Sequence, residues 1–358
     1  MLSKLIMSFR QQSAGLLLVI GVMLFCLVDS TLAATKIRGG ADPTIMKVAD
    51  TFYSAESTGD GIWVRAASSL EGLGAENVQR QRVWADTNGR GDVWAPEITT
   101  DLGRTYIYFS AGKDAAHRMY VISADSPLGT YSAESKLALP DDQWAIDGTF
   151  FVFEGKGWFV WSGWESETRN SEQTLYICRM DSPSKPIGQR YVISQPRESW
   201  EMGDSPFINE GPEAIVDPDG QLHIVYSANG SWASRYCIAD LRLRKGGDPQ
   251  YVWDWYKSNG CLFGSHQDRL MSGWDATLQI DGPGHHTFAL VNGDVNKSPG
   301  GVNHIPFVFH GVEKGTEYNW GNRAWFTGSF VWWSKTTYSR KNVPGDASNV
   351  GFSFKFFE

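Results

Sequence analysis

The sequence has no apolar run long enough for a membrane-spanning helix. Its longest run, from Ala14 to Val28, holds about 15 residues, whereas a spanning helix needs roughly 20. Lys4 precedes this run and a small-residue cleavage pattern ending at Ala33 follows it, which is typical of a secretory signal peptide. We therefore expect residues 1–33 to be removed and residues 34–358 to be exported as one domain. An uncleaved N-terminal anchor is the alternative.

Clusters of basic residues are also absent. The chain has 32 Lys and Arg against 40 Asp and Glu, which gives a net charge of -8. Proteins that bind DNA or RNA usually carry a basic stripe, and a surface of this charge repels phosphates. We therefore expect neither nucleic acid nor a membrane as a partner, and a neutral ligand fits better.

Cysteine is scarce. Of the four cysteines, Cys26 lies in the expected signal peptide, which leaves Cys178, Cys237 and Cys261 in an oxidising compartment. This odd number allows one disulfide within the chain. We favour Cys237 with Cys261, the pair closest in sequence, and expect Cys178 to be a buried strand thiol. No Cys-x-x-Cys spacing occurs, which argues against a structural zinc site.

After Thr35 the sequence lacks the sustained 3.6-residue apolar period of amphipathic helices. Short alternating runs of aromatic and β-branched residues recur instead, separated by clusters of Gly, Asp, Asn and Pro. Representative runs are Tyr106–Phe109, Met119–Ile122, Trp158–Trp161 and Leu222–Tyr226. The chain is therefore expected to be all-β.

The strand-like runs recur in groups, and each group opens with a short acidic or Pro/Gly-rich entry motif. Five groups of roughly 50 to 75 residues follow the signal peptide, a size that suits four-stranded blades. We therefore predict a five-bladed β-propeller, with a β-sandwich or a β-helix as alternative architectures. The first strand of each blade lines the channel, so the entry motifs should converge. They are Ala41-Asp-Pro43, Trp94-Ala-Pro-Glu97, Ile146-Asp-Gly148, Asn209-Glu-Gly-Pro212 and Gly282-Pro-Gly-His285.

Three of the entry motifs place a carboxylate at equivalent blade positions, namely Asp42, Asp147 and Glu210. Crowding and partial burial raise the pKa of at least one such group, which keeps an acid protonated near neutral pH. An inverting glycosidase needs such an acid and a carboxylate base about 6.5 to 9.5 Å apart. Glu97 and Glu213 are nearby acids that compete for these roles. The alternative is ordinary turn chemistry, since Asp beside Pro or Gly caps its own backbone.

Taken together and in order, the five motifs resemble those of glycoside hydrolase family 43, from about Gly40 to the end of the sequence. The resemblance implies that Asp42 is the general base, that Asp147 orients and tunes the acid, and that Glu210 is the general acid. It also implies inversion of anomeric configuration by a single displacement.

Within that family, Trp94-Ala-Pro96, Trp144-Ala-Ile-Asp-Gly148 and Gly282-Pro-Gly-His285 are most similar to α-L-arabinofuranosidases, including exo-acting enzymes on α-1,5-linked arabinan. The implied activity is the release of terminal α-L-arabinofuranosyl residues from plant cell-wall arabinan or arabinoxylan. We expect a secreted monomer that requires no cofactor. β-Xylosidases and endo-arabinanases of the same family share the fold and the three acids, and are alternatives. A carbohydrate-binding propeller without catalysis and an exported propeller that mediates protein contacts are alternatives from other classes.

Three further residues are candidates for ligand binding. Trp94 is the expected platform for a sugar ring, because its motif lies at the channel mouth. The resemblance places His285 on the channel axis, where relatives hold a water, a halide or a calcium ion. His285 is thus a candidate metal ligand, and a hydrogen-bonded loop histidine is the alternative. Arg323 is a candidate donor to sugar hydroxyls. The aromatic run Phe352–Phe357 is expected to pair with the first blade and close the propeller.

Overall fold

Strands dominate the part of the chain that the computed structural model describes, which is residues 34–265, 279–301, 304–340 and 349–357. The predicted signal peptide, residues 1–33, lies outside these ranges. Within them, no helix combines the length and the apolar character needed to cross a membrane. The helices are short 3₁₀ turns: η1 (Glu71–Gly74), η2 (Asp114–Ala116), η3 (Pro140–Asp142), η4 (Ser199–Glu201), η5 (Val252–Asp254) and η6 (Trp320–Asn322).

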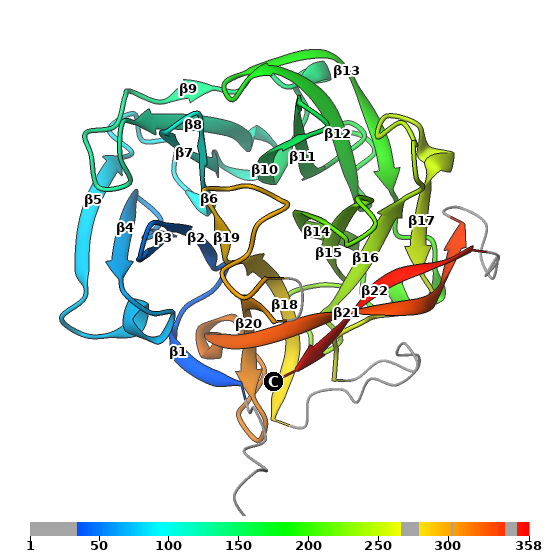
Figure 1. Cartoon of the computed structure of the whole chain (residues 1–358). Helices are drawn as coiled ribbons and strands as arrows, with labels where there is room; N and C mark the ends of the chain where they lie inside the picture. Colours follow the sequence, from blue (N-terminus) through cyan, green and yellow to red (C-terminus); the bar gives the residue numbers. More distant parts are fainter. Residues whose placement is uncertain (1–33, 266–278, 302–303, 341–348, 358) are drawn as a thin grey trace, which may run out of the picture. The chain divides into compact units, whose positions relative to one another are not determined.

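The first three blades are antiparallel sheets of four consecutive strands, and each begins at an entry motif (Figure 1). Within each blade the first strand lies at the centre of the molecule and the later strands follow outward. Their strands are β2 (Thr44–Val48), β3 (Thr51–Ser57), β4 (Gly61–Ala67) and β5 (Gln79–Ala85) in blade I; β6 (Trp94–Asp101), β7 (Arg104–Ala111), β8 (Arg118–Ala124) and β9 (Ser135–Lys136) in blade II; and β10 (Ala145–Phe153), β11 (Lys156–Gly163), β12 (Glu172–Ser182) and β13 (Lys185–Ser194) in blade III.

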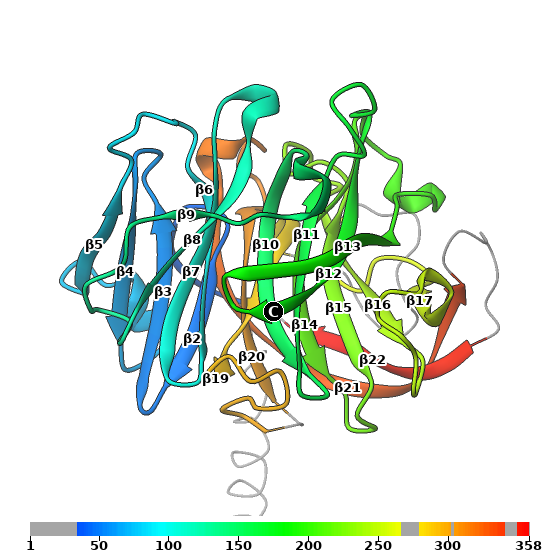
Figure 2. The same ribbon diagram turned by 90° about the horizontal axis from the view of Figure 1, so that it is seen from above.

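Blades IV and V complete the ring: Figure 2 shows blade IV on the far side from blade I, and blade V lies between them. A short parallel pairing of β12 with β14 joins blade III to blade IV, and β17 joins blade IV to blade V by pairing with β21. The predicted five-bladed β-propeller is thus confirmed. The strands are β14 (Phe207–Val216), β15 (Leu222–Ala228), β16 (Cys237–Leu243) and β17 (Trp255–Ser258) in blade IV, and β18 (Ile280–Phe288), β20 (Ile305–Glu313), β21 (Ala324–Arg340) and β22 (Asn349–Phe357) in blade V, with β19 (Leu290–Val291) beside β2.

The closure of the ring differs from the prediction. The C-terminal aromatic run belongs to β22, which pairs with β21 in its own blade and not with the first blade. The N-terminal strand β1 (Thr35–Gly39) also pairs with β21, over Ala324 to Thr327. β22 takes the following stretch from Ser329 to Tyr338. The long strand β21 therefore pairs with both the first and the last strand of the described chain. The ring is closed by β1, which pairs with the last blade.

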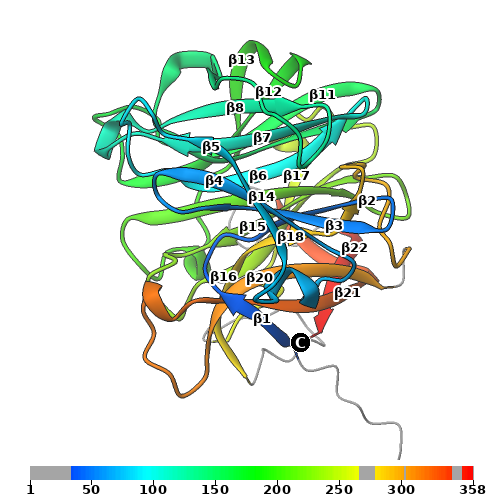
Figure 3. The same cartoon turned by 90° about the vertical axis from the view of Figure 1, so that its left-hand side faces the viewer.

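Neighbouring blades pack face to face, as the stacked sheets in Figure 3 show. A strand inside such a stack is covered on both faces, which explains why β15 and β16 are buried at every position. Separate apolar clusters fill the spaces between blades I and II and between blades II and III, and one larger cluster spans blades III to V. Burial of this kind is the main favourable contribution to folding.

The cysteines behave as predicted. Cys237 and Cys261 form a disulfide across 24 positions of sequence, and Cys178 is a free, buried thiol on β12. Burial raises the pKa of the Cys178 thiol to about 12. Because the thiolate is the reactive form, this residue is chemically inert at neutral pH.

Candidate active site

Each blade has a kink at the same place, which falls within the innermost strand in blades II to V and two residues before β2 in blade I. One residue there has a positive φ, and in blades II to V the strand pairing shifts at that point, which marks a β-bulge. Such a bulge bends the strand and redirects its side chains. The residues and their φ angles are Asp42 (50°), Ala95 (40°), Asp147 (54°), Gly211 (54°) and His285 (42°).

The three predicted acids are not all equivalent in this repeat. Asp42 and Asp147 are themselves the residues with positive φ, whereas Glu210 stands one position before Gly211. The expectation of three acids at equivalent blade positions is therefore wrong for Glu210. A glycine occupies the left-handed position in blade IV, which suits that conformation, and the acid comes from the preceding residue.

Asp42 lies among basic groups at the channel mouth. Its Oδ1 is 3.3 Å from His285 Nδ1, 3.3 Å from His310 Nδ1 and 3.9 Å from an Arg323 guanidinium nitrogen. Burial opposes ionisation of this carboxyl, but the two histidines and Arg323 outweigh it and hold the pKa of Asp42 well below its usual value. The side chain keeps 29% of its exposure, so the ionised carboxylate is within reach of water.

Asp147 is buried and contacts the strand that carries Glu210. The Gly211 backbone N–H donates to Asp147 Oδ2 at 3.0 Å, and His285 Nδ1 lies 3.9 Å from the same oxygen. Burial and repulsion by Glu210 and Asp42 raise the pKa of Asp147 well above its usual value. The structure thus brings Asp42, Asp147 and the Glu210 segment together around His285.

Glu210 is 8% exposed, and its Oε1 accepts a hydrogen bond from the Tyr236 hydroxyl at 2.9 Å. Burial raises the pKa of Glu210 to about 7, assisted by Asp42 and opposed by Tyr236 and Arg323. Glu210 therefore holds its proton to near neutral pH while Asp42 is ionised. Two carboxyl groups whose environments push their pKa values apart are typical of acid–base catalysis.

Trp94 and Arg323 also lie near Asp42. The indole of Trp94 is 42% exposed and stacks on His117, with ring centroids 4.0 Å apart. A cavity beside Asp42 is lined by Trp94, Trp325 and Arg38, among others. The placement of both candidates is compatible with their predicted binding roles, which stay predictions.

Glu97 and Glu213, the two competing acids, lie deeper in the channel, two positions beyond the kinked residue of their blades. The Thr44 hydroxyl donates to Glu97 Oε2 at 2.7 Å. Burial and repulsion by Glu213 raise the pKa of Glu97 well above its usual value, and burial raises the pKa of Glu213 to about 8. Two positions beyond Asp42, Asp147 and His285 the chain has Thr44, Thr149 and Thr287, and Glu97, Glu213, Thr149 and Thr287 line one cavity.

His285 is buried, and its Nε2 has no hydrogen-bond partner among the described residues. Burial lowers the pKa of His285 despite the nearby Asp42, so at neutral pH the ring is uncharged and able to bind a ligand. Calcium prefers six to eight oxygen ligands. Across the described ranges no three His, Cys, Asp or Glu side chains are grouped to hold a metal ion. The channel ion stays a prediction.

Two residues of the site, Tyr236 and His310, lie outside the entry motifs and were not predicted from the sequence. Tyr236 precedes the third strand of blade IV and contacts Glu210, and His310 lies on the second strand of blade V, where its Nδ1 accepts from the Asp42 backbone N–H at 3.0 Å. His310 is the pairing partner of Gly284 in an entry motif. A correct strand pairing for blade V would therefore have identified His310 from the sequence. The contact of Tyr236 with Glu210 arises only from the tertiary fold.

Comparisons with known proteins agree with this geometry. The family described as glycosyl hydrolases family 43 matches residues 37–334. An extracellular exo-α-(1→5)-L-arabinofuranosidase of Streptomyces avermitilis is 32% identical over 262 residues, which is 70% of this chain and 51% of the relative. α-L-Arabinofuranosidase 43 of Humicola insolens is 29% identical, with the same coverage of each chain. The chain thus spans about half the length of these relatives.

Solved structures show the same fold. The crystal structure of an α-L-arabinofuranosidase from Lactobacillus brevis superposes with a TM-score of 0.69 at 23% identity, covering 89% of this chain and 97% of that one. A thermostable family-43 glycoside hydrolase gives a TM-score of 0.63 at 20% identity, covering 89% and 99%. At these identities the likeness concerns the fold alone.

The raised pKa of Glu210 predicts a pH-dependent stability difference for the isosteric variant Glu210→Gln. The folded protein binds this proton more tightly than the unfolded chain, so wild type loses stability as the pH rises from about 4.5 to about 7. The variant lacks this loss. Urea unfolding should therefore show the variant gaining up to about 3 kcal/mol relative to wild type between pH 5 and pH 8. The exposed Glu165→Gln serves as control, and a difference that does not change with pH would contradict the assignment.

Proposed function

The chain belongs to glycosyl hydrolases family 43, and on this premise we propose that it releases terminal α-L-arabinofuranosyl residues from plant cell-wall arabinan or arabinoxylan with inversion of configuration. The observation that carries the proposal is the contrast between two neighbouring carboxyl groups. Asp42 is ionised and water-accessible, and Glu210 holds its proton to near neutral pH. Inverting hydrolysis needs one group of each kind.

In this mechanism the arabinofuranosyl ring lies between the two groups. Asp42 accepts a proton from a water molecule as the water attacks the anomeric carbon. On the opposite face Glu210 donates its proton to the glycosidic oxygen as the bond to the leaving group breaks. Each turnover moves one proton onto Asp42 and one off Glu210, and exchange with solvent restores both. No covalent intermediate forms.

The remaining residues hold this geometry. Asp147 accepts from the Gly211 N–H at 3.0 Å and so fixes the backbone directly after Glu210, which supports the proposed role of orienting the acid. Arg323 and the two histidines keep Asp42 ionised. Trp94 offers an exposed aromatic face beside the cavity at Asp42, and such a face suits the apolar side of a sugar ring.

The choice of arabinofuranosides over other glycosides rests on similarity. Both relatives described above are named arabinofuranosidases, and one is named an exo-acting, extracellular enzyme. Together with the signal-peptide pattern of residues 1–33, this supports export of the chain. The net charge of -8 favours a neutral glycan over nucleic acid as the partner. The monomeric state stays a prediction.

Replacing the proposed acid tests the activity. The purified protein should release arabinose from 4-nitrophenyl α-L-arabinofuranoside and from linear α-1,5-arabinan, and Glu210→Gln should lower kcat/KM on arabinan by about 10² to 10⁴-fold, the usual contribution of general acid catalysis. Glu213→Gln, a buried acid three positions along, is the matched control and should retain most of the activity. Cleavage of the matching xyloside in place of the arabinoside would overturn the substrate assignment.

The pH dependence of kcat/KM tests which group is the acid. Glu210 must be protonated, so activity should fall as the pH rises through about 7. The Tyr236 hydrogen bond favours the ionised form of Glu210, and Tyr236→Phe should therefore move this basic limb upward by on the order of one pH unit. Tyr131→Phe removes a phenol that instead donates to Pro127 O and should leave the limb in place. An unmoved or lowered limb in Tyr236→Phe would count against Glu210 as the acid.

A further inference from the structure

A buried ion pair joins η4, the turn before blade IV, to the last strand of that blade. The side chains of Glu201 on η4 and Lys257 on β17 are 0% and 1% exposed. Lys257 Nζ lies 2.8 Å from Glu201 Oε1 and 2.7 Å from Oε2, and it also donates to the Gln195 carbonyl at 2.8 Å. Two charges removed from water are costly unless both are fully paired.

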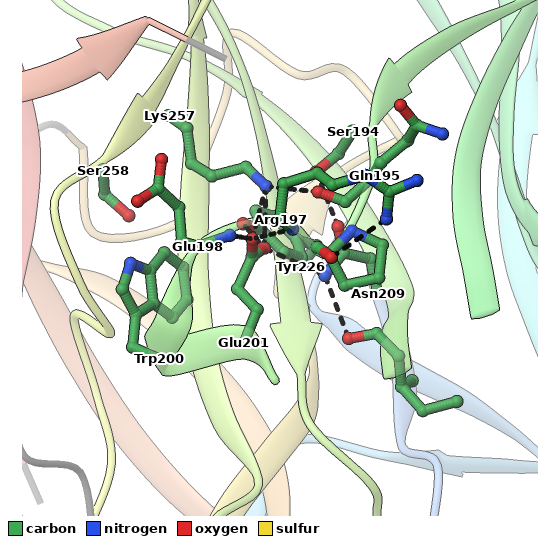
Figure 4. A network of polar contacts seen from close by, with 12 residues as sticks. Ser194, Gln195, Arg197, Glu198, Trp200, Glu201, Asn209, Tyr226, Lys257 and Ser258 are labelled. Carbon is green, nitrogen blue, oxygen red and sulfur yellow. Dashed lines mark hydrogen bonds and ion pairs between the residues drawn. The ribbon is translucent and has the colours of Figure 1, made fainter. Parts of the chain in front are cut away.

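Four more donors surround the Glu201 carboxylate (Figure 4). The backbone N–H groups of Arg197 and Glu198 donate to Oε2 at 3.1 and 3.0 Å. The Tyr226 hydroxyl donates to Oε1 at 2.8 Å, and Asn209 Nδ2 donates to the same oxygen at 3.0 Å. With Lys257, donors come from five separate residues, and together they fix the carboxylate in one position.

Asn209 links this network to the active site, because it directly precedes Glu210. Its Oδ1 accepts from the Ser194 hydroxyl at 2.6 Å, and its carbonyl accepts from the Ser162 hydroxyl at 2.9 Å. Both serines belong to blade III. Asn209 is therefore held by polar groups of two blades, and Asp147 holds the backbone on the other side of Glu210.

We propose that Asn209, anchored by the buried Glu201–Lys257 pair, is a positioning residue that sets the place of the Glu210 carboxyl against the leaving-group oxygen. The proposal rests on the function proposed above. Stability alone is a weak reason for such a pair, since apolar residues of similar volume often stabilise as well or better. Oriented contacts from two blades instead restrict the strand that carries the acid, and small displacements of a catalytic group cost large factors in rate.

Substrates that differ in their need for an acid separate positioning from stability. Nitrophenolate leaves without being protonated, whereas a sugar hydroxyl is a poor leaving group that depends on general acid catalysis. A misplaced Glu210 should therefore slow hydrolysis of α-1,5-arabinobiose much more than hydrolysis of 4-nitrophenyl α-L-arabinofuranoside. A general loss of folded protein would lower both rates in the same proportion.

Asn209→Ala is the main variant. We expect kcat on arabinobiose to fall about tenfold or more and kcat on the nitrophenyl glycoside to fall less than about threefold. KM should change little for either substrate, because the Asn209 side chain points into the network and not toward the cavity beside Asp42. Lys257→Met removes the charge from the network without touching Asn209, and should shift the ratio of the two rates in the same direction by a smaller factor.

Asp254→Asn is the matched control. It breaks the partly buried pair of Asp254 with Arg244 in the same blade. The Asp254 carboxylate accepts from Arg244 and from the Asp248 backbone N–H, outside the network around Asn209. Its ratio of rates should equal that of wild type even if its Tm falls.

The outcomes separate the two proposals. A wild-type ratio of rates in Asn209→Ala, at whatever Tm, would overturn the positioning role while leaving the proposed function intact. If Asn209→Ala does not fold, the ratio in Lys257→Met decides in the same way. A wild-type protein that hydrolyses neither substrate would overturn the proposed function, and the positioning role with it.

Discussion

At the inner edge of each blade the chain adopts a positive φ where a regular strand would continue its pleat. This local conformation turns Asp42, Asp147 and His285 toward one another, although more than a hundred positions of sequence separate each from the next. In blade IV a glycine takes the strained position and the preceding Glu210 supplies the acid. In blades II to V the kink lies between paired stretches of the strand. The site residues come from four different blades, so the geometry of the site depends on how the blades are arranged in the ring.

Crowding carboxyl groups into one channel is unfavourable unless their environments differ. Here the differences are large. Basic groups surround Asp42 and keep it ionised, while Glu210 is buried and accepts a hydrogen bond from the Tyr236 phenol. Burial raises the pKa of both deeper acids, Glu97 and Glu213, and repulsion by Glu213 raises that of Glu97 further. One channel thus holds carboxyl groups with distinct protonation at neutral pH, which is the electrostatic basis of the proposed mechanism.

Much of this could be predicted from the sequence. The five entry motifs, spaced by one blade each, indicated the propeller and the residues that meet at its centre. The exact alignment of the motifs could not be predicted. Glu210 is shifted by one residue relative to Asp42 and Asp147, and this shift is visible only from the positions of the β-bulges. The closure by β1 was missed because its short polar strand resembles a linker. Tyr236 and the Glu201–Lys257 pair come from segments without a repeat, and only tertiary packing brings them to the site.

The central claim is a single displacement in which water, activated by Asp42, attacks opposite the bond that Glu210 protonates. The configuration of the first sugar released tests it most directly. Proton NMR recorded during the first minutes of hydrolysis of an α-1,5-arabino-oligosaccharide should show β-L-arabinofuranose appearing before mutarotation sets in. Initial release of the α-anomer would mean two displacements through a covalent intermediate, and would contradict the roles proposed for both carboxyl groups.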